Sequence, residues 1–563
     1  MVSALVTTAT KRVPARILPP CTLGQARKGY LNAGEEGRVR DDNGPGLRHG
    51  SSQALLTVLL LTTLVSTVAG LRWSARHPLG TSWDESQYLN LMLQDVQDAR
   101  DLGVLHAARM VRWTDSGRPP AYRMAAFPFA EAFGPNLRIL RALCLVVLLF
   151  TSAVIYRAAR LVSEQSVAAV AAACFALSYA PLWASAHFGT DYVLYLATAG
   201  LYYCLVSYAV RPTGADAWLW VGLVAAVALG ALSKVSFLAI GLPAILAFLV
   251  VGWRAGFAKR VLWLVGISAA IGLLVTLPWW SVNDRAAMSL AQSASGFVRH
   301  DFPWFTESFW RLFGPPVATL VVLLAVALVQ RRQLLRWATS SSQRLVVFST
   351  CVAGAVPLFL LHFLGSNHNM RLVSPALIPS ILGVSLLAEV TGVASVRGAV
   401  AMAGTLVVLQ GAYMTHHFET STIDLWDWDP LLALCDQHGL REPVVKHLGQ
   451  AIAFNPAALA YPWIRRGRTV HESWLWRFEQ GPIEWDRIGT EVSTADVVVT
   501  APAFTGDPDD KEPLDNQHNA ELVARLETLP AFEPPTELRL GRFDTRVLVF
   551  FRRRAGRAAA PSP

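Results

Sequence analysis

The sequence contains few charged residues for a chain of its length. Charged residues make up 16% of the 563 positions and hydrophobic residues make up 53%, whereas a soluble globular protein carries about 25% charged residues. The apolar residues are gathered in separate runs, each close to the roughly 20 residues that span a bilayer. This composition excludes an ordinary soluble protein and indicates a polytopic α-helical membrane protein.

Cysteine is also scarce, and its placement indicates neither a disulfide framework nor a metal site. Four of the six cysteines, Cys144, Cys174, Cys204 and Cys351, lie within apolar runs, where a thiol packs as a small apolar side chain. The chain has no CxxC motif and no Cys/His spacing typical of a zinc site. We therefore expect no metal ligand set; a divalent metal is not required, and its presence is left open.

Residues 1–53 lack the short apolar core and small-residue cleavage site of a signal peptide. They are rich in Gly, Pro, Arg and Thr and show little periodicity. We interpret them as a disordered cytoplasmic tail, with a misassigned start codon as the alternative.

Apolar runs begin at Ala54 and continue to about residue 415. They lie near 54–71, 139–156, 167–186, 191–210, 217–232, 235–252, 261–280, 313–330, 345–364, 373–390 and 398–415. Their lengths predict about eleven transmembrane helices. The two short runs around Lys234 leave a bent or re-entrant element open.

The distribution of positive charge predicts the orientation in the membrane. The formal net charge of +9 does not indicate nucleic acid, because a membrane protein concentrates Arg and Lys in its cytoplasmic loops. With a cytoplasmic N-terminus, the inside loops hold Arg157, Arg160, Arg211, Arg254, Lys259, Arg260, Arg331, Arg332, Arg336, Arg344 and Arg397. We expect the protein to lie in the inner or plasma membrane of the cell. One span then places the segment 72–138 on the outer side, and an odd total number of spans places the C-terminal region there as well.

Residues 416–563 lack the long apolar runs of the preceding region, and their pattern predicts a small α/β domain. The segments 495–500 (ADVVVT) and 546–551 (RVLVFF) have the pattern of buried strands. Asn455-Pro456 is typical of a helix N-cap followed by Pro at the first helical position, and 517–526 predicts a further helix. We expect this domain to fold on the outer side of the membrane.

The first outer loop, 72–138, carries the most suggestive polar residues. Asp84 and Glu85 follow the first span by about a dozen residues, so they lie near the outer membrane surface. A carboxylate there can act as general base toward a hydroxyl group of an acceptor. The alternative is structural, because Ser82-x-x-Glu85 matches a capping box at a helix start.

Further along the same loop, Arg118-Pro119-Pro120-Ala121-Tyr122-Arg123 combines two guanidinium groups with a phenol. Arg is suited to binding phosphate, and the hydroxyl of Tyr to binding a sugar. The alternative is a surface loop whose Arg side chains reach the headgroup region.

Three other places put polar groups where a membrane makes them costly. His187 and Asp191 lie between the third and fourth spans, Lys234 lies between two short runs, and His368 and Arg371 precede a late span. An outer Lys and an outer Arg run against the positive-inside trend, so we interpret Lys234 and Arg371 as anion ligands. The two histidines alone fit ordinary hydrogen-bonded loop residues equally well.

Taken in order, these motifs resemble the GT-C superfamily of membrane glycosyltransferases that use polyprenyl-phosphate sugars. The nearest types are protein O-mannosyltransferases and lipid A aminoarabinose transferases, and the likeness covers about residues 54–415. It is carried by Asp84-Glu85, Arg118-Pro119-Pro120-Ala121-Tyr122, Leu232-Ser233-Lys234, Leu277-Pro278-Trp279-Trp280, and Arg371 with Pro375 and Pro379. The family often has Tyr after the late Arg, where this chain has Leu372.

The resemblance implies that Asp84 is the catalytic base of an inverting sugar transfer on the outer face. It implies that Lys234 and Arg371, and then Arg118 and Arg123, bind the lipid phosphate, with Glu85 supporting Asp84 or orienting the acceptor. Tyr122, His187, Asp191 and His368 complete the expected substrate site. The donor is a polyprenyl-phosphate sugar, while the acceptor is left open among lipid, glycan and protein.

Two other classes of function remain as alternatives. A secondary transporter or lipid flippase also carries ions within its membrane region, but it would need polar groups at mid-membrane depth. A non-catalytic envelope assembly protein would tolerate Asp84→Asn without loss of function.

Overall fold

The computed structural model describes residues 67–211, 217–296, 341–364, 370–390, 423–477, 480–503 and 513–553, together with isolated positions at 57, 61, 64, 65, 405 and 409. The expected tail, the expected spans at 313–330 and 398–415, and His368 lie outside the described residues. All of the described residues belong to one compact unit, 54–563.

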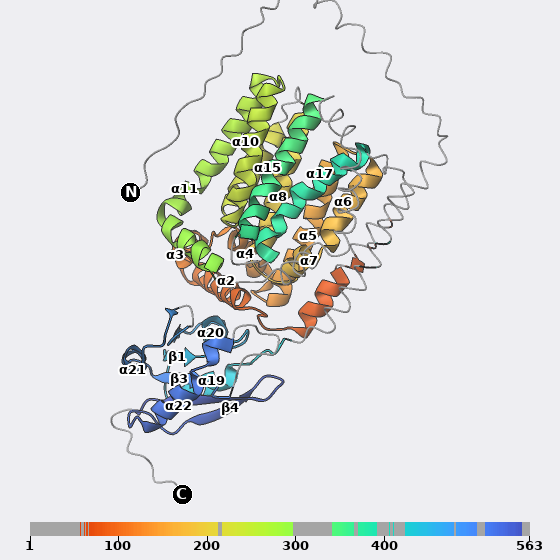
Figure 1. The fold of residues 1–563 in the computed structure, drawn as a ribbon. Helices are drawn as coiled ribbons and strands as arrows, with labels where there is room; N and C mark the ends of the chain where they lie inside the picture. Colours follow the sequence, from red (N-terminus) through yellow and green to blue (C-terminus); the bar gives the residue numbers. More distant parts are fainter. Residues whose placement is uncertain are drawn as a thin grey trace, which may run out of the picture. The chain divides into compact units, whose positions relative to one another are not determined.

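The apolar runs form a bundle of helices, which Figure 1 shows side by side. Within the described residues, five helices are long and apolar enough to cross a bilayer: α5 (Leu137–Arg160), α8 (Asp191–Val210), α10 (Ser236–Arg254), α11 (Lys259–Gly296) and α15 (Ser342–Leu364). Shorter apolar helices are α9 (Ala217–Ala231) and α17 (Leu377–Val390), and α17 is preceded by α16 (Met370–Val373) and η1 (Ser374–Ala376). The predicted helical membrane architecture is confirmed, while the predicted number of spans stays a prediction.

The run 167–186, expected as one span, is divided into two helices. These are α6 (Gln165–Leu177) and α7 (Tyr179–Ala186), and their axes differ by 52°. Ser178 between them is extended. Because Pro181 has no N–H, it cannot continue the ladder of α6 to the carbonyl of Leu177. The second helix, α7, ends directly before the turn that leads from His187 to Asp191, the first residue of α8.

The first outer segment, expected as a loop, is largely helical. It forms α2 (Trp83–Leu102), α3 (Val104–Thr114) and α4 (Ala121–Phe133). Glycines with positive φ, Gly103 and Gly134, end α2 and α4, since glycine adopts that conformation without a Cβ penalty. Ser82 caps α2, its Oγ accepting from the Glu85 N–H at 3.1 Å. The N-cap half of the predicted capping box is therefore present, while the Glu85 carboxylate accepts from the Thr81 N–H and not from that of Ser82. Asp84 lies in the first turn of α2.

The predicted C-terminal α/β domain is also confirmed. Its sheet has the order β2-β1-β3-β5-β4, with β1, β2 and β3 parallel and β5 antiparallel to both β3 and β4. The strands are β1 (Val444–Leu448), β2 (His471–Trp474), β3 (Val497–Thr500), β4 (Thr536–Leu540) and β5 (Thr545–Phe551). The helices are α19 (Asp429–Gln437), α20 (Pro456–Arg465), α21 (Trp485–Val492) and α22 (Asn519–Thr528), with the 3-10 turn η3 (Pro513–Asn516) before α22. The predicted N-cap is present, because Asn455 Oδ1 accepts from the Ala458 N–H at 3.0 Å.

Helix α20 of this domain packs against α2, the helix that carries Asp84. Asn90 Nδ2 donates to the carbonyl of Ala457 at 2.8 Å, and Gln97 Nε2 donates to that of Ile464 at 2.9 Å. Ala460 and Ile464 join the buried apolar cluster of α2 and α4. The domain is thus joined by a common core to the first outer segment.

A glycine at the end of β1 gives a test of the domain's packing. Gly449 has φ +107°, and an added Cβ would lie 2.7 Å from Asn516 Oδ1 and 2.7 Å from Asn519 Nδ2. We predict that Gly449→Ala destabilises the domain by about 1–3 kcal/mol through backbone strain and steric overlap. Thermal unfolding of the purified chain, followed by limited proteolysis of the domain, measures this loss.

Gly489→Ala is the matched control, because Gly489 lies inside α21 with open space around its Cβ position. It should leave stability unchanged or raise it by up to ~1 kcal/mol. Equal melting temperatures for the two variants would contradict the described packing around Gly449.

Candidate active site

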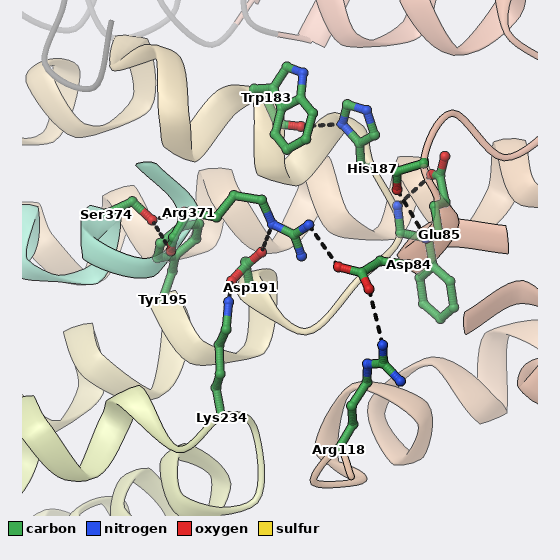
Figure 2. Close-up of polar contacts among 12 residues, drawn as sticks. Asp84, Glu85, Arg118, Trp183, His187, Asp191, Tyr195, Lys234, Arg371 and Ser374 are labelled. Atoms are coloured by element: carbon green, nitrogen blue, oxygen red, sulfur yellow. Dashed lines mark hydrogen bonds and ion pairs between the residues drawn. The ribbon is translucent and has the colours of Figure 1, made fainter. Parts of the chain in front are cut away.

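Asp84 lies between two arginines that come from distant parts of the chain (Figure 2). Its carboxylate accepts from Arg118 Nη2 at 3.1 Å and from Arg371 Nη1 at 3.1 Å. Arg118 belongs to the segment between α3 and α4, and Arg371 to α16. The Asp84 side chain is 32% exposed, so it can be reached from solvent.

Asp191, the first residue of α8, holds the second half of the same arrangement. It accepts from Lys234 Nζ at 2.8 Å and from Arg371 Nε at 2.9 Å, and its side chain is only 2% exposed. Arg118, Asp84, Arg371, Asp191 and Lys234 therefore form a continuous row of alternating charges, here called the charge row. A third carboxylate, Asp115, lies 3.8 Å from Arg118 Nη1 at the end of the row, so the three cations are balanced by three carboxylates, and an anion that binds these cations must compete with a carboxylate.

Three hydrogen bonds between different segments hold the charge row together, and a fourth joins Ser374 to Arg371 within one segment. The Phe188 N–H donates to Glu85 Oε1 at 2.8 Å, and the Ala121 N–H donates to the Leu232 carbonyl at 2.8 Å. Ser374 Oγ contacts Tyr195 Oη at 2.6 Å and donates to the Arg371 carbonyl at 3.0 Å. Each of the three bonds joins a residue close in sequence to one member of the charge row to a residue close in sequence to another member.

The cations decide the protonation state of Asp84. Burial works to raise the pKa of this carboxyl, but Arg371, Arg118 and Lys234 outweigh it and hold the pKa below its usual range. Asp84 is therefore ionised at neutral pH. A carboxylate held this way is a weak base for as long as both arginines are bound to it.

Glu85 follows Asp84 in the first turn of α2, and both of its carboxylate oxygens accept hydrogen bonds. It is 1% exposed, and its two oxygens accept five hydrogen bonds, from Arg141 Nε and Nη2, from the N–H and Oγ1 of Thr81, and from the Phe188 N–H. Burial works to raise the pKa of Glu85, but Arg141 outweighs it and brings the pKa to about 2. This arrangement favours the expectation that Glu85 supports Asp84 over the expectation that it orients an acceptor.

Arg141 is the residue that sequence reasoning missed. It lies in the first turn of α5, is 0% exposed, and also donates to the carbonyls of His77 and Leu79. Its guanidinium lies 4.8 Å from the centre of the Trp73 ring. The available signal was a cation three residues inside an apolar run, which is costly unless it has a partner.

The structure places Arg123 and Tyr122 outside the charge row. Arg123 is 1% exposed and pairs with Asp95, its Nε donating at 2.8 Å, while its Nη2 donates to Thr114 Oγ1 at 2.8 Å. Tyr122 is fully buried, with its ring centre 4.6 Å from that of Tyr88. Both residues stabilise the first outer segment beneath Arg118.

His187 also lies beside the charge row and not within it. Its Nδ1 is 2.6 Å from the Trp183 carbonyl oxygen, and its ring lies between those of Trp183 and Trp73 at 3.9 and 4.4 Å. Burial lowers the pKa of His187 to about 4, so the ring is neutral at neutral pH. It fits a packing residue of the outer turn.

Both carboxylates of the charge row are paired with cations in this structure. A divalent metal needs several oxygen or nitrogen ligands from one place, and here both Asp84 and Asp191 are already bound by cations. Within the described ranges there is no group of three or more His, Cys, Asp or Glu that could hold a metal. We derive no step through a metal.

Comparisons with known proteins agree with the geometry. Residues 117–281 match the family described as dolichyl-phosphate-mannose-protein mannosyltransferase, whereas no curated protein sequence gives a match. ArnT from Cupriavidus metallidurans in the apo state has a TM-score of 0.53 at 13% identity, over 90% of this chain and 98% of that chain. The same protein bound to undecaprenyl phosphate has a TM-score of 0.51 at 13% identity, over 89% and 98%.

A third solved structure shares the fold. The oligosaccharyltransferase from Archaeoglobus fulgidus, in complex with Zn and sulfate, has a TM-score of 0.51 at 13% identity, over 87% of this chain and 72% of that chain. The shared fold confirms the predicted GT-C architecture, and the family match over residues 117–281 supports the predicted membrane glycosyltransferase.

The pair Glu85–Arg141 gives a test of what holds the site. Arg141→Met leaves a buried carboxylate without its main partner, so we predict a loss of about 3–5 kcal/mol in stability. In the double variant Glu85→Gln/Arg141→Met the loss should be smaller than the sum of the single losses by about 1 kcal/mol or more. Thermal unfolding in detergent measures all three variants.

Arg525→Met serves as the control, because it removes an exposed pair with Glu521 on α22. A pair of that kind contributes about 0–1 kcal/mol. If Arg141→Met melts at the same temperature as Arg525→Met, the pair does not hold the site as described.

Proposed function

We propose that this membrane glycosyltransferase transfers a sugar from a polyprenyl-phosphate donor to a hydroxyl acceptor, with Asp84 as the general base. The main support is the charge row, where the partly exposed carboxylate of Asp84 is paired with Arg118 and Arg371, and a third cation, Lys234, is held next to Arg371 by Asp191. Displacement of a phosphate leaving group needs these two elements side by side: a base for the acceptor and positive charge for the departing oxygen.

Two relatives support a lipid phosphate as the donor's carrier. The matching family is described by a dolichyl-phosphate sugar, and one solved structure of the shared fold contains undecaprenyl phosphate. The family match spans Arg118, Asp191 and Lys234. In our proposal Lys234 and Arg371 bind the phosphate and Arg118 assists them.

The reaction is a single displacement. The acceptor oxygen forms a bond to the anomeric carbon while the bond from that carbon to the phosphate oxygen breaks, and the electron pair of the broken bond stays on the phosphate. Asp84 takes the acceptor proton and later releases it to water. Because attack comes from the side opposite the leaving group, the configuration at the anomeric carbon is inverted.

The remaining predicted residues support this centre. Glu85, held by Arg141, fixes the start of α2 so that Asp84 faces Arg118 and Arg371. Arg123, Tyr122 and His187 pack the surrounding segments, and no metal or other cofactor is needed for the displacement. The C-terminal domain, which packs on α2, helps to select the acceptor.

We place this chemistry on the outer face of an inner or plasma membrane. The positive-inside distribution of Arg and Lys puts the N-terminus in the cytoplasm and the first outer segment outside. The acceptor is a lipid, a glycan or a protein presented at that face.

Sugar transfer from labelled polyprenyl-phosphate sugars, in membranes that carry wild type or variants, tests the proposal. Asp84→Asn should express normally and lose about 10²-fold or more of the activity, because a general base contributes that much. Lys234→Ala should also lose activity through weaker binding of the phosphate.

Asp101→Asn is the control, since Asp101 is an exposed carboxylate on the same helix α2 and should transfer at the wild-type rate. Full activity of Asp84→Asn would make Asp84 a helix-start residue only and would overturn the mechanism. If wild type consumes no donor, the alternative of a secondary transporter or lipid flippase takes first place.

A further inference from the structure

Arg371 is shared by the two carboxylates of the charge row, and they hold it unequally. Asp191 accepts from Arg371 Nε at 2.9 Å and from Lys234 at 2.8 Å, with its side chain 2% exposed. Asp84 accepts from Arg371 Nη1 and from Arg118 at 3.1 Å each, with its side chain 32% exposed. The outer carboxylate is therefore the weaker and more accessible partner of the same guanidinium.

This sharing conflicts with the role of Asp84 as a base. A general base needs a lone pair free for the acceptor proton and a pKa near the working pH. While both arginines bind Asp84, its oxygens are engaged and its pKa is held low. The charge row as described is a resting state in which the base is bound by the cations that the donor needs.

We propose that the donor's phosphate displaces Asp84 from Arg118 and Arg371, so that binding of the donor releases the base. Asp191 is not displaced and acts as a positioning residue that keeps Arg371 and Lys234 together. This inference rests on the proposed function. It adds that the donor must bind first, because the acceptor can be deprotonated only after the donor's phosphate has released Asp84.

The difference in burial decides which carboxylate leaves. A phosphate oxygen is a strong acceptor for guanidinium and competes directly with a carboxylate. Release of Asp84 moves a side chain that is already partly in contact with solvent, whereas release of Asp191 would leave a buried charge without a partner, which is far more costly. The phosphate therefore replaces the outer carboxylate.

The same exchange works in reverse after the transfer. Asp84 then carries the acceptor proton, is neutral, and does not compete for Arg371. The product is a phosphate monoester with a charge between about −1.5 and −2 at neutral pH, where the donor diester carries one negative charge. The more negative product is held more strongly by the arginines than the donor is. Asp84 loses its proton to water and pairs with the arginines again once the lipid phosphate has left.

Binding of undecaprenyl phosphate to the purified full chain in detergent tests the exchange without any sugar. Asp84→Asn removes the competing charge and should bind undecaprenyl phosphate more tightly than wild type. We expect about a 3- to 30-fold lower Kd, the range for release of two partly exposed ion pairs. Asp191→Asn, which loosens Arg371 and Lys234, should bind no more tightly than wild type.

Asp101→Asn is again the control and should have the wild-type Kd. Equal Kd values for wild type and Asp84→Asn, or undecaprenyl phosphate binding to neither, would overturn the exchange. Equal tightening in Asp84→Asn and Asp191→Asn would also overturn it, because net charge alone would then explain the effect.

The transfer assay separates this inference from the proposed function. Loss of transfer in Asp84→Asn with unchanged binding of undecaprenyl phosphate would leave the general base in place and reject only the exchange. Full transfer by Asp84→Asn would reject the general base, whatever the binding result.

Discussion

The structure of the site depends on one arginine, Arg371, held between two carboxylates from different helices. Asp84 comes from the first turn of α2 and Asp191 from the first residue of α8. Glu85, next to Asp84 in α2, accepts from the Phe188 N–H and from Arg141, and so joins the start of α2 to the segment that leads into α8. The buried pair Glu85–Arg141 thus sets the position of Asp84, while Asp191 sets the position of the cations.

Burying these charged side chains costs free energy of folding, which argues for a functional role. Burying ion pairs seldom adds net stability compared with apolar residues of similar volume. The bundle nevertheless places Arg141, Glu85 and Asp191 where almost no solvent reaches them. The part of the row that stays accessible is the part that a reaction would use, namely Asp84 with the guanidinium ends of Arg118 and Arg371.

Much of this could be predicted from the sequence, because charges in an apolar context are rare and therefore informative. That criterion selects Asp191, Lys234 and Arg371, the motifs of the polar segment 72–138 select Asp84 and Arg118, and the structure brings all five together. The partners of Glu85 and Arg123 could not be predicted, since Arg141 and Asp95 become their neighbours only through tertiary packing. Hydropathy finds apolar segments but does not show where a helix breaks, so the break at Ser178 could not be predicted from it. It also does not find helices in the polar segment 72–138, where α2 and α4 pack against α5, α8 and α20.

The most direct test of the account is an experimental structure of the full chain with undecaprenyl phosphate bound. We predict that the phosphate lies within hydrogen-bonding distance, about 2.7–3.2 Å, of Arg371 and Lys234, and that the carboxylate of Asp84 has left both arginines. A phosphate bound elsewhere, with Asp84 still joined to Arg118 and Arg371, would contradict the assignment of the charge row as the site of sugar transfer.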